Sequence, residues 1–272
     1  MKRGRRIFVT YGNEGYYKSL ERIREEAGAT GRFDEIRVYT DKDLPGSITD
    51  HELFKYRRGG GYWFWKPWVI LDVMKDMDDD DVLIYSDAGS KIYDHREWDR
   101  WFGIMSRKSA LFFFYSGLVE TWTRKNIIEY FHDINRFPEC FQLIACLFLL
   151  RKSSMYLIEE WYGLMRDHPE LVIDVDRDMM KYESPAFVEN RHDQSILTGV
   201  VYRHMNDRGI KLLYQGCEIQ HPGGQAVFAA RISDNEQRNN TAVFPRHLEL
   251  IRRCYVVPMK YLRLNYLRIG NR

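Results

Sequence analysis

The chain is organised around two stretches, GGGYWFWKPW at residues 59–68 and DVLIYSDAG at residues 81–89. Three consecutive glycines allow backbone conformations and close approaches that a side chain would prevent. Pro67 fits the first turn of a helix, where a missing N–H costs nothing, and that helix carries an apolar stripe. Residues 82–85 form a short apolar run, typical of a strand buried on both faces of a parallel sheet. Asp87 follows this strand, at the position where ligands bind in open α/β sheets.

The bulk composition limits the classes of function. The chain has 272 residues, of which 44% are hydrophobic, so it can bury a sizeable core. Its net charge of +2 comes from 41 basic and 39 acidic residues, which argues against a nucleic-acid partner. The longest apolar run, residues 143–150, is far too short to span a membrane, and only a peripheral membrane contact stays open. Four cysteines without a CxxC pair, and no secretory leader, predict a cytoplasmic protein with reduced thiols.

Strand and helix patterns alternate along the chain. Strands are predicted at residues 7–10, 36–40, 82–85, 110–115, 144–150 and 211–214, and helices at 16–27, 98–105, 123–131 and 154–165, with two more beginning at 65 and 193. Residues 174–189 read as a loop. This alternation predicts an α/β fold with a mostly parallel central sheet and helices on both faces. No repeat and no clean linker interrupts the pattern, so a single domain is expected.

Four motifs carry a resemblance to a known family. VTYG at residues 9–12, RGGGYWFWKP at 58–67, YSDAG at 85–89 and RHDQS at 191–195 occur in this order. Together they resemble GT-A-fold glycosyltransferases of the kind found among capsular-polysaccharide and cell-surface glycan enzymes. The resemblance covers residues 7–205, and the tryptophan–lysine–proline block is its most specific part. It implies transfer of a sugar from a nucleotide sugar to a hydroxyl of a glycan acceptor.

The resemblance also implies how the single domain, residues 1–272, is divided. Residues 1–110 would form a Rossmann-like nucleotide-sugar-binding half, residues 111–230 an acceptor and catalytic half, and residues 231–272 a basic C-terminal segment. A UDP-sugar is favoured as the donor over a GDP-sugar, and retention of configuration is favoured over inversion. The expected donor-binding residues are Thr10, Tyr11, Gly12, Asp41, Arg58, Tyr62, Trp65, Lys66, Ser86, Asp87, Ala88 and Gly89.

A divalent metal, Mn²⁺ or Mg²⁺, is the expected cofactor, since it would stabilise the departing diphosphate. GT-A enzymes usually present a D-x-D pair at this strand end. Here Asp87 is the first acid, but Gly89 stands where the second would be. His221, in the stretch QHPG at residues 220–223, is the candidate for a second ligand. Because a hard cation requires several oxygen ligands, the missing acid leaves undecided whether a metal binds.

Asp193 and Gln194 are the expected catalytic residues. Asp193 opens a predicted helix, whose dipole would keep the carboxylate ionised and lower its basicity. Such a group suits the stabilisation of a positive, oxocarbenium-like sugar. A helix cap is the simpler role for Asp193, and both roles can hold together.

Two other functions stay open. A nucleotidyltransferase uses a similar sheet, but usually has a glycine-rich, basic loop after its first strand, whereas residues 11–17 contain an acid and only two glycines. A catalytically inactive glycan-binding protein would retain the fold and lose turnover, in keeping with the missing second acid. A dehydrogenase is disfavoured because no GxGxxG motif follows the first strand.

Overall fold

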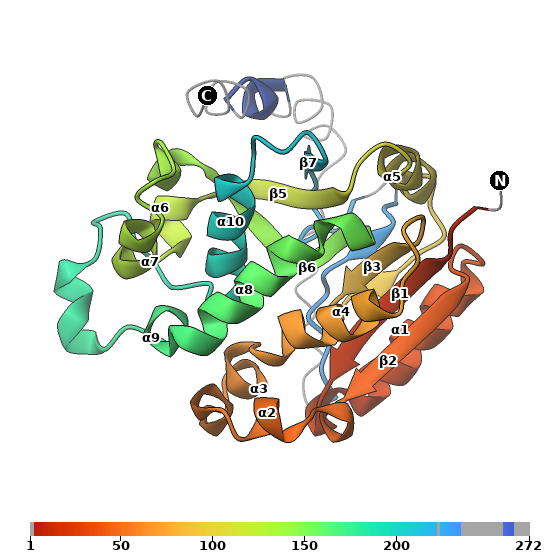
Figure 1. Cartoon of the computed structure of the whole chain (residues 1–272), viewed down its shortest axis with the longest axis horizontal. Coiled ribbons are helices and arrows are strands. Elements are labelled where there is room, and N and C mark those ends of the chain that lie inside the picture. The colour runs from red at the N-terminus through yellow and green to blue at the C-terminus, as the bar shows by residue number, and fades with distance from the viewer. Residues whose placement is uncertain (1–2, 222–223, 235–257, 264–272) are drawn as a thin grey trace.

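A six-stranded sheet with the order β2-β1-β3-β6-β5-β7 forms the centre of the molecule (Figure 1). The computed structural model describes residues 3–221, 224–234 and 258–263. The strands are β1 (Arg6–Gly12), β2 (Glu35–Thr40), β3 (Val82–Ser86), β5 (Ala110–Leu118), β6 (Phe141–Leu150) and β7 (Ile210–Tyr214). Strand β6 runs antiparallel to β3 and β5, and the other pairings are parallel. The predicted α/β fold with a mostly parallel sheet is therefore confirmed.

Helices cover both faces of this sheet. The longer ones are α1 (Tyr17–Ala29), α4 (Trp65–Lys75), α5 (Glu97–Met105), α8 (Met155–Asp167) and α10 (Asp193–Arg203). Helices α4, α8 and α10 pack on one face, and α1 and α5 pack on the other. Short turns of helix connect them: α2 (Gly46–Thr49), α3 (Gly59–Tyr62), α6 (Val119–Trp122), α7 (Lys125–Tyr130) and α9 (Pro169–Val172). Within the described ranges, no helix combines the length and apolarity that a membrane crossing requires.

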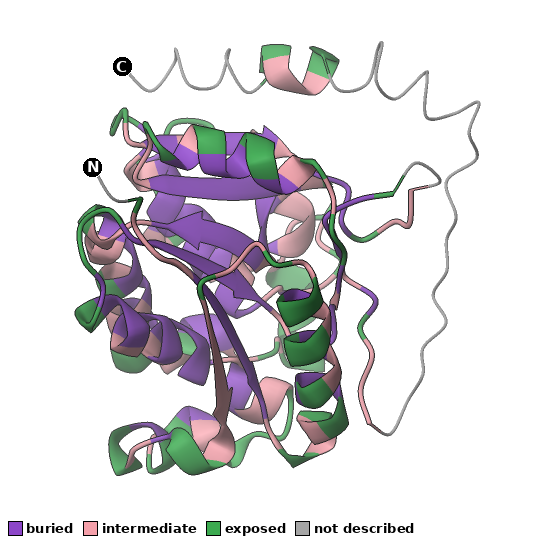
Figure 2. Ribbon diagram, turned by 90° about the vertical axis from the view of Figure 1, so that its right-hand side faces the viewer, coloured by how far each residue is buried: buried purple, intermediate pink, exposed green. Residues whose placement is uncertain are grey.

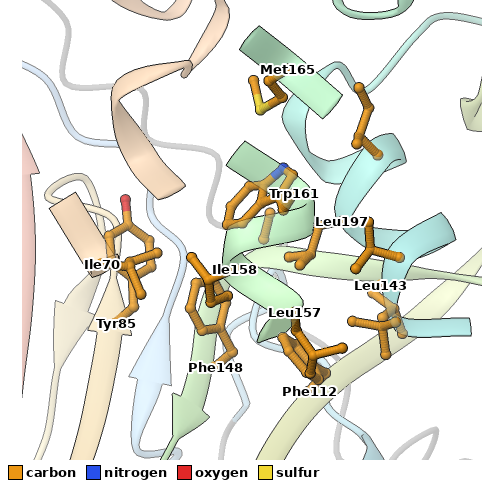
Figure 3. Close-up of a cluster of buried hydrophobic side chains, with 14 of the residues drawn as sticks. Ile70, Tyr85, Phe112, Leu143, Phe148, Leu157, Ile158, Trp161, Met165 and Leu197 are labelled. Carbon is orange, nitrogen blue, oxygen red and sulfur yellow. The ribbon is translucent and has the colours of Figure 1, made fainter. Parts of the chain in front are cut away.

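The central strands β1, β3 and β6 are buried on both faces, as their continuous apolar runs predict, whereas the edge strand β2 is only half-buried. Neighbouring residues of β1 illustrate this, since Val9 belongs to the core beneath α4 and α8, whereas Phe8 belongs to the core beneath α1. In the first of these cores, Trp161 of α8 packs toward Phe148 of β6 (Figure 3). The central strands are buried throughout, while the outer sides of the helices are exposed (Figure 2).

A second, two-stranded sheet lies beside the first. It pairs β4 (Lys91–Ile92) with β8 (Val227–Phe228) in antiparallel fashion. From β8 the chain continues along Gly89, whose carbonyl accepts a hydrogen bond of 3.0 Å from the Ile232 amide. Asp234 then caps α1 by accepting hydrogen bonds from the Lys18 amide at 2.9 Å and the Ser19 amide at 3.1 Å. Residues 226–234, here called the return segment, thus join the late part of the chain to the first strands.

The main departures from the predicted elements lie between residues 115 and 144. Strand β5 continues to Leu118 and β6 begins already at Phe141, with irregular register between them. The helix predicted at residues 123–131 is the shorter α7, and the separate helix α6 ends before it at Trp122. Most of the basic segment at residues 231–272, including Cys254 and all but residues 231–234 and 258–263, lies outside the described residues.

Candidate active site

A cavity of about 690 Å³ opens at the carboxyl ends of β1 and β3. Its walls come from parts of the chain that are far apart in sequence: the end of β1, the glycine-rich stretch, the residues after β3, the middle of β6, the start of α10 and the return segment. Ligands bind at this end of a parallel sheet because the strands there release loops toward a common crevice. The cavity is therefore the candidate active site.

The glycine-rich stretch forms one wall through an unusual turn. Gly59, Gly60 and Gly61 have φ angles of +60°, +58° and +92°, and Tyr62 and Trp63 follow with +51° and +59°. A Cβ on Gly59 would lie 2.4 Å from the Trp63 ring, so only glycine fits there. The turn brings the Trp65 indole N–H to the Gly59 carbonyl at 3.0 Å. Trp65 also stacks on Tyr11 with ring centroids 3.8 Å apart, which ties this stretch to the end of β1.

The floor of the cavity holds a buried lysine between two carboxylates. The Lys66 ammonium lies 2.9 Å from Asp193 Oδ2 and 3.3 Å from Asp87 Oδ1. It also donates a hydrogen bond of 3.3 Å to the Ala145 carbonyl of β6. The side chains of Lys66 and Asp193 are 2% and 6% exposed, whereas that of Asp87 is 33% exposed. Asp87 is therefore the carboxylate that a bound molecule reaches most easily.

Burial sets the protonation of Asp193. Burial raises the pKa of this carboxyl to about 6, although Lys66 acts in the opposite direction. The helix dipole was the basis for expecting lowered basicity, but removal of the carboxylate from water outweighs it. Burial also opposes the charge on Lys66, yet Asp193 and Asp87 outweigh it and raise the pKa of the ammonium. Lys66 is thus charged at neutral pH, and Asp193 changes protonation state just below neutrality.

Asp87 is held by its own strand and by β6. The buried Tyr85 hydroxyl donates a hydrogen bond of 2.7 Å to Asp87 Oδ1. The Asp87 amide donates to the Cys146 carbonyl at 3.2 Å. Burial, together with the Asp87 charge, raises the pKa of Tyr85 well above its usual value, so the phenol stays a donor. These contacts fix the carboxylate at the edge of the cavity.

Arginine side chains add positive charge to the walls. Arg57, Arg58, Arg191 and Arg231 all line the cavity. Three of them have a nearby acid: Arg58 pairs with Asp174 at 3.0 Å, Arg191 with Glu189 at 3.0 Å and Arg231 with Glu218 at 2.6 Å. Guanidinium groups present several donors in a plane that matches phosphate oxygens. The walls are therefore suited to an anionic ligand such as a diphosphate.

His192 shapes the start of α10. It has a φ of +49°, which is strained for a residue with a side chain. Its Nδ1 lies 2.7 Å from the Val172 carbonyl, and its ring packs against Tyr62 and Trp63. Burial lowers the pKa of the imidazole, so it is neutral at physiological pH. The residue positions the helix start that carries Asp193 and Gln194.

Most of the predicted site residues meet in this cavity. Those that line it are Tyr11, Gly12, Arg58, Trp65, Lys66, Asp87, Ala88, Gly89, Asp193 and Gln194. Thr10, Asp41, Tyr62, Ser86 and His221 do not line it.

Strand alternation and local hydrogen bonds explain these five exceptions. Thr10 and Ser86 follow Val9 and Tyr85, whose side chains face α4, so their own side chains point to the opposite face of the sheet. Asp41 instead accepts a hydrogen bond of 2.6 Å from the Tyr17 hydroxyl. The Tyr62 hydroxyl donates to Asp174 at 2.8 Å, behind the wall. His221 Nε2 lies 3.0 Å from the Gly216 carbonyl.

Several lining residues were not predicted. Arg191 lies inside the RHDQS motif, and its positive charge next to His192 could have indicated contact with an anionic ligand. Arg57 adjoins the glycine run and carried a similar signal. Glu218 and Arg231 gave none, because they lie in stretches without periodicity, Glu218 after β7 and Arg231 in the return segment.

The predicted metal cofactor does not suit the residues present. Asp87 Oδ1 already accepts the Tyr85 hydroxyl and faces Lys66. A Cβ at Gly89 would lie 3.1 Å from the Ile232 carbonyl oxygen and 3.2 Å from Arg231 Cα, so a side chain there would require the return segment to shift by a few tenths of an ångström. Nowhere in residues 3–221, 224–234 and 258–263 do three or more His, Cys, Asp or Glu side chains gather as a metal site. The metal stays a prediction that the donor set does not favour.

Comparisons with known proteins identify similar folds. No protein-family model and no curated protein matches this chain. Galactosyltransferase LgtC, in complex with donor and acceptor sugar analogs, is similar in structure at 13% identity, over 80% of this chain and 76% of that chain, with a TM-score of 0.43. Mouse xyloside xylosyltransferase 1 is similar at 13% identity, over 79% and 86%, with a TM-score of 0.38.

A protein of another class is also similar. The 4-diphosphocytidyl-2C-methyl-D-erythritol synthase from Anaerococcus prevotii has 12% identity over 78% of this chain and 89% of that chain, with a TM-score of 0.39. Glycosyltransferases and a nucleotide-using synthase therefore both occur among the structures that this chain is similar to. At these identities and TM-scores, they assign no activity and no residue role to it.

Proposed function

We propose that this chain is a glycosyltransferase that moves a sugar from a nucleotide-diphosphate donor to a hydroxyl of a glycan acceptor. The observation that carries the proposal is the cavity of about 690 Å³, in which arginines line the walls and a lysine joins two carboxylates on the floor. Its size is in the range of small-molecule sites. A sugar donor requires both features, since its diphosphate is anionic and its reacting carbon becomes positive.

The geometry suggests how a donor would be oriented. The arginines would face the diphosphate and stabilise the charge that develops as the glycosidic bond breaks. The sugar would then lie toward Asp87 and Asp193 at the floor. Tyr11 and Trp65, stacked on each other at the end of β1, would form the side of the cavity nearest the base. We propose a UDP-sugar as the donor.

Asp193 would act on the reacting sugar. As a carboxylate it would stabilise the positive charge at the anomeric carbon, and Gln194 beside it would hold a sugar hydroxyl. We propose that the configuration is retained. Inversion would instead use Asp193 as the base for the acceptor hydroxyl, a role that its raised pKa also allows. The anomer of the product, determined by NMR, separates the two outcomes.

Nucleotide binding is the first test of this function. A ligand at 100 times its Kd adds about 2.7 kcal/mol to the native state, which appears as a rise in Tm of several degrees. We expect UDP to raise the Tm more than GDP or CMP does. Arg191→Met should reduce the rise, whereas Arg24→Met, on the exposed side of α1, should leave it unchanged. No rise with any nucleotide would contradict the proposal and favour a glycan-binding protein.

A nucleotidyltransferase is the second candidate, because the same arginine-lined walls would accept a nucleoside triphosphate. The two reactions release different products. A nucleotidyltransferase given a nucleoside triphosphate and a sugar 1-phosphate releases pyrophosphate, while a glycosyltransferase given a nucleotide sugar releases a nucleoside diphosphate. Measurement of both products under the same conditions decides between them.

A further inference from the structure

We propose that Lys66 is the resident cation of this site, joining Asp87 to Asp193 in the place where a divalent metal would bind, so that the donor is bound without a metal. The second half of this inference rests on the proposed glycosyltransferase function. The first half concerns the chain alone. It assigns to Lys66 a positioning role toward two carboxylates, in place of the diphosphate contact that the sequence predicts.

Three protein oxygens lie around the Lys66 ammonium. An ammonium carries three N–H groups and no acceptor. Asp193 Oδ2, Asp87 Oδ1 and the Ala145 carbonyl lie at 2.9, 3.3 and 3.3 Å from its nitrogen. The side chain is only 2% exposed, so protein oxygens surround its charge on the sides where these contacts lie. Its charge is used within the protein.

The same contacts engage one oxygen of each carboxylate. Asp87 Oδ1 accepts from the Tyr85 hydroxyl at 2.7 Å and faces Lys66. Asp193 Oδ2 faces the same ammonium and is buried. A metal bridging these carboxylates would displace Lys66 and leave a buried, unpaired ammonium, which is strongly unfavourable. The lysine and a divalent ion therefore compete for one place.

The return segment packs tightly against the position of the missing second acid. At Gly89 a Cβ would meet the Ile232 carbonyl oxygen at 3.1 Å, and the Gly89 carbonyl accepts from the Ile232 amide at 3.0 Å. The same segment places Arg231 in the cavity wall, where it pairs with Glu218. This edge of the cavity therefore has a glycine in place of the second acid, and an arginine beside it. A glycine offers no side-chain ligand to a metal.

The decisive experiment measures nucleotide binding by the unmodified protein. UDP and GDP are titrated by calorimetry in EDTA, and again with Mn²⁺ and with Mg²⁺. We expect the Kd of the bound nucleotide to agree within about twofold in all three conditions. Binding that tightens about tenfold or more with a metal would overturn the inference and leave the proposed function standing. No binding in any condition would overturn both.

A second experiment requires no nucleotide and uses Mn²⁺ alone, followed by electron paramagnetic resonance. We expect no specific Mn²⁺ binding by the wild-type chain, and binding at least about tenfold tighter by Lys66→Met, in which both carboxylates are released from the ammonium. Lys152→Met is the control, since Lys152 donates to the Met77 carbonyl at 2.7 Å, away from the cavity. Specific Mn²⁺ binding by the wild type, or equal binding by wild type and Lys66→Met, would overturn the assignment. The wild-type measurement can refute the inference by itself, even if Lys66→Met folds poorly.

Discussion

Two carboxylates at the floor of the cavity differ in environment although both contact Lys66. Asp193 is buried at the start of α10, and its pKa is raised to about 6 by burial. Asp87 is more open and keeps a hydrogen bond from Tyr85. Two acids of unequal environment can serve different steps of one reaction. The buried acid suits the reacting centre, and the open one suits contact with the donor.

The pH dependence of the rate should report Asp193. If its carboxylate is the reacting form, kcat/KM should fall about tenfold per pH unit below a pKa near 6, because the group is progressively protonated. Loss of Lys66 removes a positive charge that favours the ionised form of Asp193. In Lys66→Met the fall in kcat/KM should therefore begin at a higher pH. Initial rates measured from about pH 4 to pH 8 test both statements. A fall in kcat/KM that begins only near about pH 4, the ordinary pKa of an aspartate, would contradict them.

Asp87→Asn should nearly abolish turnover and leave the fold intact. The residue follows β3 at the cavity edge, where its side chain is 33% exposed, and the buried Lys66 keeps Asp193 as its other charge partner. Product formation and the far-ultraviolet circular dichroism spectrum are the two measurements. The matched variant is Asp99→Asn on α5, whose exposed carboxylate pairs with Arg32 away from the cavity. Full activity in Asp87→Asn would remove Asp87 from the mechanism.

At the scale of elements, the left-handed turn at residues 59–63 explains why three glycines occur together. The turn reverses the chain tightly enough to bring the Trp65 indole back to the Gly59 carbonyl. Glycine adopts positive φ angles without the steric cost that other residues meet. Tyr62 and Trp63 bear that cost, and their rings are held by contacts with His192. Strain of this kind persists where the surroundings over-determine the backbone.

Gly59→Ala should lower the free energy of unfolding by about 1–3 kcal/mol. Its φ of +60° disfavours a side chain, and the new Cβ would lie 2.4 Å from the Trp63 ring. Gly163→Ala in α8 is the control, because nothing lies within 4 Å of a Cβ there. That control should be neutral or stabilising by about 0.5–1 kcal/mol, since alanine favours helix. Urea unfolding measures both, and equal stability of the two variants would contradict the role of the turn.

At the scale of the whole molecule, the return segment links distant parts of the chain across the cavity. It pairs with β4, runs along Gly89 and ends by capping α1 through Asp234. Arg231 lines the cavity only because this segment lies there. The site is therefore a product of long-range packing, and its affinity for anions depends on a contact outside the cavity.

Asp234→Ala should weaken both stability and nucleotide binding. Loss of the cap on α1 should cost about 1 kcal/mol of unfolding free energy, and release of the segment should withdraw Arg231 from the cavity. Asp43→Ala is the control, since Asp43 accepts a hydrogen bond of 2.7 Å from the Thr40 amide in a similar cap away from the cavity. We expect the control to lose stability alone. Urea unfolding and nucleotide titration of both variants test this. Equal nucleotide affinities of Asp234→Ala and Asp43→Ala would show that the return segment does not contribute to binding.

Much of the fold was accessible from local patterns. The apolar runs at residues 7–10 and 82–85 predict strands because they are buried on both faces, and β1 and β3 form there. Asp87 and Asp193 were found because each ends or begins a predicted element. Thr10 and Ser86 were misplaced, because adjacent strand residues face opposite sides and the sequence does not say which side holds the ligand.

The amino-acid sequence by itself determined the class of fold, the backbone freedom that three consecutive glycines allow, and the strand end and helix start that carry the two acids. These are local properties, set by backbone sterics and by the period of apolar residues. Only the tertiary structure decided that Lys66 lies between Asp87 and Asp193, that burial raises the pKa of Asp193, and that the return segment packs against Gly89. Burial and charge pairing depend on which residues meet in space, and no local pattern specifies that.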